Sequence, residues 1–149
     1  MVVGTGFLIG CTHASAGQAG AEIDVCKLVS AEQVKKLYRK PLYATAHTNE
    51  CSWSEKPGGM ADMDIHVMDV DGPLRDYFAN PLPSRLKLVK ITDLGDEGLM
   101  SVGEGTLGVV EIRKGKRLLQ SAVTFLDIEP GSDKQAVLWD IYREILKQM

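Results

Sequence analysis

The first 21 residues of this 149-residue chain contain no charged side chain. All 17 basic and 20 acidic residues lie from Glu22 onward. Residues 1–10 are mostly apolar and residues 12–21 are small and polar, which is the pattern of a secretory signal. The apolar run is too short to cross a bilayer as a helix, which takes roughly 20 residues. The basic region that usually leads such a signal is missing, which indicates either a start further upstream or a truncated signal.

Positive charge is also scarce for a nucleic-acid-binding protein. The formal net charge is −3 and the pI is about 5.6, whereas binding to phosphates needs clustered Lys and Arg. Lys35, Lys36, Arg39 and Lys40 do cluster, but at the predicted end of a helix, where the helix dipole favours cations. We therefore expect no nucleic-acid partner.

Signatures of catalysis are missing as well. The chain has no G-x-S-x-G motif, no C-x-x-C motif and no Cys/His cluster. Two glycine-rich stretches, Gly4–Gly10 and Gly103–Gly108, match nucleotide-binding fingerprints in letters only, because neither stands between a strand and a helix. Asp96 and Glu97 are expected to be loop residues. We predict that the protein is not an enzyme and uses no cofactor.

An acidic stretch is a candidate metal site. Its members are Asp62, Asp64, His66, Asp69 and Asp71. The alternation of side chains along a strand places the first three on one outward face, and hard cations prefer carboxylates. A calcium loop that began at Asp69 would need Glu at its twelfth position, where the chain has Asn80. We therefore expect a solvated strand face and a helix cap, and no metal site.

The chain has only three cysteines, Cys11, Cys26 and Cys51. An odd number is awkward for an exported protein, because one thiol is left over. If Cys11 carries a lipid, Cys26 and Cys51 remain as a pair. A bond between them would close a loop of about 25 residues and contribute on the order of 3.5 kcal/mol. Such a bond persists only in an oxidising compartment; two free buried thiols are the alternative.

The sequence around Cys11, Leu8-Ile9-Gly10-Cys11, resembles the lipobox of bacterial lipoproteins. The resemblance implies that a dedicated peptidase cuts before Cys11, which then carries a diacylglycerol and an N-acyl chain. Several acyl chains give stable membrane anchoring, and the residues up to 21 would form a flexible tether. Cleavage after Ala14-Ser15-Ala16 would instead give a soluble periplasmic or secreted form, and a cytosolic protein is a third alternative.

Residues 22–149 predict a single globular α+β domain, preceded by the signal, lipobox and tether of residues 1–21. Ser30 with Gln33, and Ser132 with Gln135, are capping boxes that start two helices, and a short third helix is predicted from Gly72 to Phe78. Strands are predicted over 43–54, 61–67, 99–102, 106–113 and 116–126. Because hairpins dominate, we expect a mainly antiparallel sheet of about five strands with three helices, in the order α-β-β-α-β-β-β-α.

Four stretches, Asp24–Glu32, Cys51–Trp53, Leu94–Glu97 and Val110–Leu118, look like motifs of a large group of small bacterial lipoproteins of unknown function. The similarity covers nearly everything from residue 24 onward. The resemblance implies that Cys26 and Cys51 pair, and it brings no catalytic residues. The element order is similar to the Mog1/PsbP-like α/β/α sandwich, which implies helices on both faces of the sheet.

The expected function follows from these features. We expect an envelope lipoprotein, held to a membrane through Cys11, that is a non-catalytic binding or accessory domain for a protein partner or a small apolar ligand. Trp53, Tyr43, Tyr77 and Phe78 are the candidates to line an apolar pocket between a helix and the sheet, although core packing is the more common use of such residues. A hydrolase-like enzyme with an unrecognised site and a purely structural envelope protein are the alternative functions.

Overall fold

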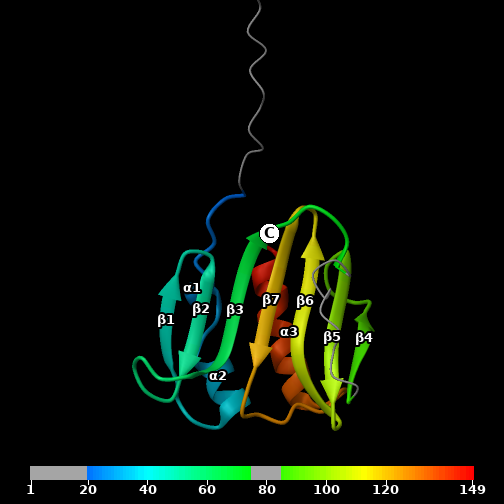
Figure 1. Cartoon of the computed structure of the whole chain (residues 1–149). Helices are drawn as coiled ribbons and strands as arrows, with labels where there is room; N and C mark the ends of the chain where they lie inside the picture. Colours follow the sequence, from blue (N-terminus) through cyan, green and yellow to red (C-terminus); the bar gives the residue numbers. More distant parts are fainter. Residues whose placement is uncertain (1–19, 75–84) are drawn as a thin grey trace, which may run out of the picture.

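The computed structural model of the chain describes residues 20–74 and 85–149 (Figure 1). Seven strands form one fully antiparallel sheet in the order β1-β2-β3-β7-β6-β5-β4. The strands are β1 (Tyr43–His47), β2 (Glu50–Ser54), β3 (Ala61–Asp69), β4 (Leu86–Ile91), β5 (Glu97–Gly103), β6 (Thr106–Lys114) and β7 (Arg117–Val123). The first three and the last four strands each form a meander, and the pairing of β3 with β7 joins the two.

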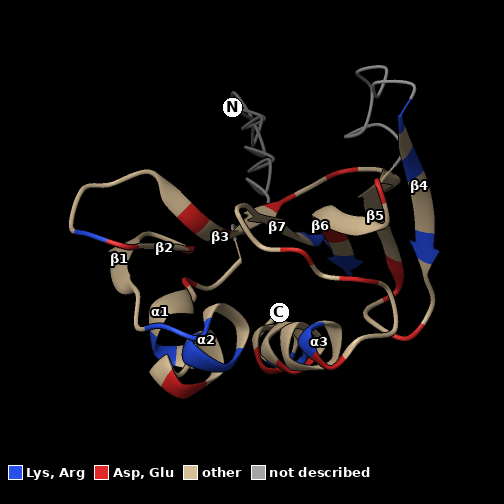
Figure 2. Cartoon of the chain, turned by 90° about the horizontal axis from the view of Figure 1, so that it is seen from below, with Lys and Arg blue, Asp and Glu red and all other residues tan. Residues whose placement is uncertain are grey.

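Three helices lie in the described part of the chain, and all of them cover the same face of the sheet (Figure 2). They are α1 (Val25–Leu28), α2 (Ala31–Tyr38) and α3 (Asp133–Leu146). The predicted capping box is present at α2, where Ser30 Oγ accepts from the Gln33 N–H and Gln33 Oε1 accepts from the Ser30 N–H. At α3 Ser132 is the N-cap as predicted, but Gln135 turns back to the Gly131 N–H instead.

The main core lies between the helices and this face of the sheet. Met63, Ile65 and Val67 of β3 are fully buried there, as their alternation along the strand predicts. Tyr142 of α3 is also fully buried, and its ring lies 5.8 Å from that of Trp139. Each such side chain contributes roughly 1.5–3 kcal/mol by leaving water, so this face supplies most of the hydrophobic stabilisation. A smaller cluster around Leu118 lies on the opposite face.

The prediction of an α+β class with an antiparallel sheet is confirmed, but the prediction of about five strands is wrong. The stretch 43–54 is two strands, because Asn49 adopts a left-handed conformation (φ 56°) and turns the chain back on itself; Asn is one of the few residues that tolerate this conformation. The other additional strand is β4, where the sequence pattern is ambiguous. The observed order therefore begins with two helices, and the helix predicted from Gly72 to Phe78 lies mostly outside the described residues.

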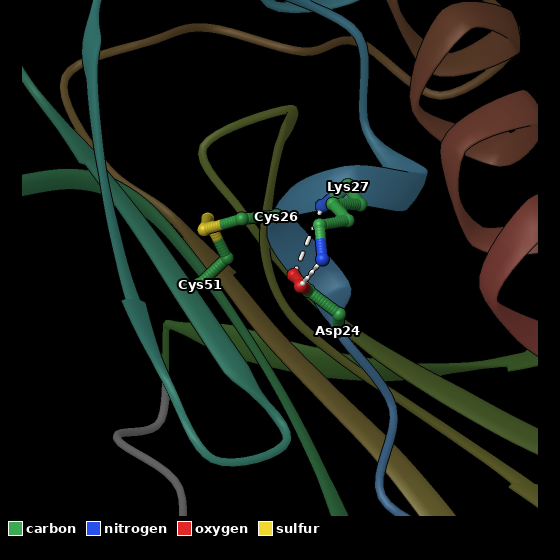
Figure 3. Close-up of a disulfide and its surroundings, with 4 residues drawn as sticks. All are labelled: Asp24, Cys26, Lys27 and Cys51. Carbon is green, nitrogen blue, oxygen red and sulfur yellow. Dashed lines mark hydrogen bonds and ion pairs between the residues drawn. A yellow bond between two sulfur atoms is a disulfide. The ribbon is translucent and has the colours of Figure 1, made fainter.

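A disulfide connects α1 to β2 (Figure 3). Cys26 and Cys51 are bonded with their Cα atoms 5.1 Å apart, which is within the range that a disulfide can bridge. Cys51 has no solvent exposure. Next to the bond, Asp24 caps α1 by accepting from the Lys27 N–H and pairs with the Lys27 ammonium at 2.8 Å. The four-residue helix α1 is thus held by its N-cap and by the disulfide at its second residue.

The described chain starts at one end of the sheet, where β3 finishes (Figure 1). The Gly20 N–H donates to Asp69 Oδ2 at 3.1 Å, and the same carboxylate pairs with Arg117. Over residues 20–74 and 85–149, none of the helices is long and apolar enough to cross a membrane.

Candidate functional site

A cavity of about 490 Å³ opens at the other end of the sheet. Residues from the end of α2, the β2–β3 loop, the start of β3 and the connection after β7 line it. These residues are Lys40, Glu55, Lys56, Gly59, Met60, Asp62 and Phe125, and we refer to the space between them as the Asp62 cavity. Its volume falls within the range of pockets that bind small molecules.

Two large apolar side chains of the Asp62 cavity stand in solvent. Met60 is 77% exposed and Phe125 is 75% exposed. Phe125 also has a positive φ of 56°, a conformation that costs a residue with a Cβ atom roughly 1–2 kcal/mol. Neither burial nor backbone preference accounts for an aromatic residue at this position. Strained residues of this kind are concentrated at functional sites.

Asp62 contributes the buried polar group of the cavity. The residue is only 4% exposed, and its main chain is fixed because its carbonyl accepts from the Tyr38 hydroxyl at 2.6 Å and from the Thr124 N–H at 2.7 Å. Burial, and next the charge of Asp62, raise the pKa of the Tyr38 hydroxyl. Among the described residues, however, no hydrogen-bond donor reaches the Asp62 carboxylate.

The remaining charges of the cavity are largely engaged with one another. Lys40 donates a hydrogen bond to Glu55, and this contact raises the pKa of Lys40 and lowers that of Glu55. Lys40 also interacts electrostatically with Asp62 but donates no hydrogen bond to it. The cavity therefore combines a paired lysine, an exposed lysine at position 56, and the carboxylate of a mostly buried residue to which no described residue donates a hydrogen bond.

A second cavity of about 380 Å³ lies at the end of the sheet near the C-terminus of α3. Its charged groups already have partners: Lys114 Nζ donates to the Leu146 carbonyl at 2.5 Å, Arg143 pairs with Asp93 at 3.4 Å, and Asp96 accepts from the Gly115 N–H at 2.7 Å. These contacts attach the β4–β5 loop and the β6–β7 turn to one another and to α3. We infer that the residues of this cavity have a structural role.

The contacts of residues 94–97, which end at the first residue of β5, explain why two of the motifs identified in the sequence occur together. Leu94 is buried, the Asp96 carboxylate fixes the turn at Gly115, and Glu97 pairs with Arg113 across neighbouring strands at 3.2 Å. The stretches Leu94–Glu97 and Val110–Leu118 therefore contact each other. Asp96 and Glu97 hold these two segments together. Asp96 lies in the loop before β5, as expected, whereas Glu97 is the first residue of β5 and the loop prediction is wrong for it.

The prediction that the acidic stretch forms a solvated strand face is wrong for Asp62, which is buried. The regular pairing of β2 with β3 shifts at Trp53/Ser54, next to Asp62, so that strict alternation no longer applies there. Asp64 and His66 are half-buried on the strand, and Asp69 pairs with Arg117. Within residues 20–74 and 85–149, no group of three or more His, Cys, Asp or Glu side chains is arranged to hold a metal ion.

A second buried acidic residue, Glu111 of β6, was not predicted from the sequence. It is 2% exposed. Gln120 Nε2 donates to its Oε1 at 2.6 Å, but Oε2 has no hydrogen-bond partner in the described part of the chain. Because Glu111 stands between Val110 and Ile112 on the strand, its side chain is expected on the opposite face of the sheet from theirs. The sequence does not indicate that this face is covered at Glu111.

Burial raises the pKa of Glu111 above its usual value of 4.5, and the hydrogen bond from Gln120 opposes the rise. A carboxyl whose pKa is higher in the folded state costs stability as the pH rises from the unfolded pKa through the folded one. We therefore expect Glu111→Gln to increase the free energy of unfolding at pH 7 by about 1–2 kcal/mol. The gain should vanish near pH 4, as measured by urea unfolding at both pH values. Glu22→Gln at an exposed position is the control, and an equal gain at both pH values would contradict this account.

The structure describes two of the four residues predicted to line an apolar pocket, Trp53 and Tyr43. Trp53 is 3% exposed and packs in the core beside Met63. Tyr43 is exposed on the edge strand β1. Neither lines the Asp62 cavity or the cavity near α3. Tyr77 and Phe78 lie outside the described residues, as does Cys11, the predicted lipidation site.

Sequence reasoning also missed Phe125 and Met60. A signal for both was present, because each is a large apolar residue in a segment rich in turn residues, and such side chains in exposed loops often serve binding. Met60 is two residues from Asp62 in the sequence, but Phe125 belongs to the distant connection after β7, and only the folded chain brings it to them. Comparison of the chain with protein-family models, curated proteins and solved structures finds no match.

Proposed function

We propose that this protein is an exported, lipid-anchored and non-catalytic binding domain of the bacterial cell envelope. The disulfide between Cys26 and Cys51 is the observation that carries the proposal. Such bonds are rare in reducing compartments, and this one uses two of the three cysteines. Cys11 is then left as the cysteine of a lipobox-like sequence, and acylation would account for it.

The placement of the Asp62 cavity supports a binding role in the space beyond the membrane. A tether from Cys11 would join the domain at Gly20, which is bonded to Asp69 at the end of β3. The cavity is at the start of the same strand. From Asp62 to Asp69 the strand extends about 23 Å, at roughly 3.3 Å per residue. The cavity would thus face away from the membrane, where a soluble ligand or an envelope protein can reach it.

Cys11→Ala, expressed at full length in a bacterial host, tests the anchor. We expect nearly all of the variant to leave the mature membrane-bound pool, whereas His13→Ala, as the control, remains with the membranes. Globomycin, which blocks the lipoprotein signal peptidase, should cause the uncleaved precursor of the wild-type protein to accumulate. Membrane fractionation and mass spectrometry of the intact protein measure both effects. A Cys11→Ala protein that still fractionates with membranes would refute the anchor.

A further inference from the structure

Asp62 is only 4% exposed, but it lines the cavity, where water can reach its carboxylate. None of the described residues donates a hydrogen bond to that carboxylate, although the main chain of the residue is firmly held. A hydrogen bond to a carboxylate is stronger than one between neutral groups, and the low exposure of the residue limits the water that competes with a ligand donor. The Tyr38 hydroxyl and the Thr124 N–H are both committed to the Asp62 carbonyl, so they cannot serve the carboxylate. A ligand that carries N–H donors can.

Phe125 and Met60 supply the apolar part of the same cavity. The face of an aromatic ring attracts cations, and a methionine side chain adapts to apolar groups of many shapes. The Phe125 side chain is exposed and its φ is positive, and both features cost free energy. A ligand that covers the ring would offset the cost of both.

The charges of the cavity favour a cation over an anion. Lys40 is already paired with Glu55, which leaves Lys56 and Asp62. Asp62 is the more buried of the two, and electrostatic interactions are stronger where water is excluded. We propose that the Asp62 cavity binds a ligand with an ammonium or guanidinium group on an apolar stem, the cation against Asp62 and the stem against Met60 and Phe125. This assignment of ligand chemistry rests on the proposed binding function.

The ligand cation has two possible sources, a small free amine or a basic side chain of an envelope protein, and two probes distinguish them. One is 2-phenylethylammonium, and the other is the blocked peptide acetyl-Phe-Arg-amide. Neutral 2-phenylethanol and anionic phenylacetate are the matched controls for charge. Isothermal titration calorimetry of the oxidised protein measures binding. We expect at least one cationic probe to bind at least tenfold more tightly than both controls, and the tighter of the two probes identifies the source.

Three variants locate the binding. Asp62→Asn keeps the shape and the backbone contacts of the residue, and it should weaken the cationic probe at least tenfold, roughly the effect of a hydrogen bond to a charged group. Phe125→Gly should abolish most binding without loss of thermal stability, because glycine adopts a positive φ without strain. Asp127→Asn, an exposed acid on the same connection, is the control and should bind as the wild-type protein does.

The outcomes separate this inference from the proposed function. Tighter binding of phenylacetate or 2-phenylethanol, unchanged affinity in Asp62→Asn, or failure of both cationic probes to bind would overturn the assignment of a cationic ligand. None of these results changes the fractionation of Cys11→Ala. Conversely, a failed anchor test leaves the calorimetric result intact.

Discussion

Replacing Cys26 and Cys51 together by alanine is expected to lower the free energy of unfolding by about 3 kcal/mol. The bond closes a loop with a sequence separation of 25 residues, and the chain-entropy model gives roughly 3.5 kcal/mol for such a loop. It also fixes α1, which is only four residues long and has too few backbone hydrogen bonds to form a stable helix alone. Thermal unfolding of the oxidised wild-type protein and of the double variant should differ by roughly 10 °C or more.

Reduction provides the matched control for this prediction. Treatment with a reductant should lower the unfolding temperature of the wild-type protein toward that of the double variant and leave the variant unchanged. Non-reducing peptide mass spectrometry should find Cys26 linked to Cys51. If both thiols can be alkylated in the denatured, unreduced protein, the bond does not form and the argument for an oxidising compartment is lost with it.

Gly95→Ala should destabilise the domain by about 3 kcal/mol. Gly95 has a φ of 64°, and a Cβ atom there would lie 2.6 Å from the Arg113 carbonyl oxygen and 2.6 Å from Ile112 Cγ2. Left-handed strain costs roughly 1–2 kcal/mol, and the steric conflict adds about as much again. Because the first clash involves backbone, it cannot be relieved by rotating a side chain, and the hydrogen bonds around Asp96 must be distorted. Urea unfolding measures the loss.

Gly115→Ala separates the two contributions. Gly115 has almost the same φ, 60°, but no atom lies within 4 Å of the position of an added Cβ. We therefore expect a loss of about 1 kcal/mol, from backbone strain alone. Equal losses in the two variants would show that the contact of the β4–β5 loop with β6 contributes nothing, and would contradict the tight packing of Leu94–Glu97 on the neighbouring hairpin.

The local features of the fold are predictable from the sequence because each depends on neighbouring residues. Ser30 with Gln33 forms the predicted capping box, and the alternation of Met63, Ile65 and Val67 gives the buried face of β3. The strands predicted over 106–113 and 116–126 are also present as β6 and β7, which pair on either side of the turn at Gly115. Asn49 shows the limit: a single residue with a positive φ divides a predicted strand in two, and a pattern of hydrophobicity does not register a change of direction.

The candidate site was predicted less well, because its members are common residue types whose meaning depends on what surrounds them. Trp53 looks like a pocket residue by type but packs in the core. Asp62 looks like an outward residue by alternation, but the shift in pairing next to it changes its surroundings. Phe125 looks like an ordinary loop residue until its exposure and its φ are known.

The class of the domain, the starts of its two longer helices and the candidate cysteine pair are predictable from the chain alone, because these features follow from spacing and composition over short stretches. The pairing of β3 with β7 and the burial of Asp62 and Glu111 become known only from the folded chain. One cause accounts for all three. Pairing between distant strands and the burial of a side chain are set by segments from elsewhere in the chain, and no local pattern specifies which segments those are.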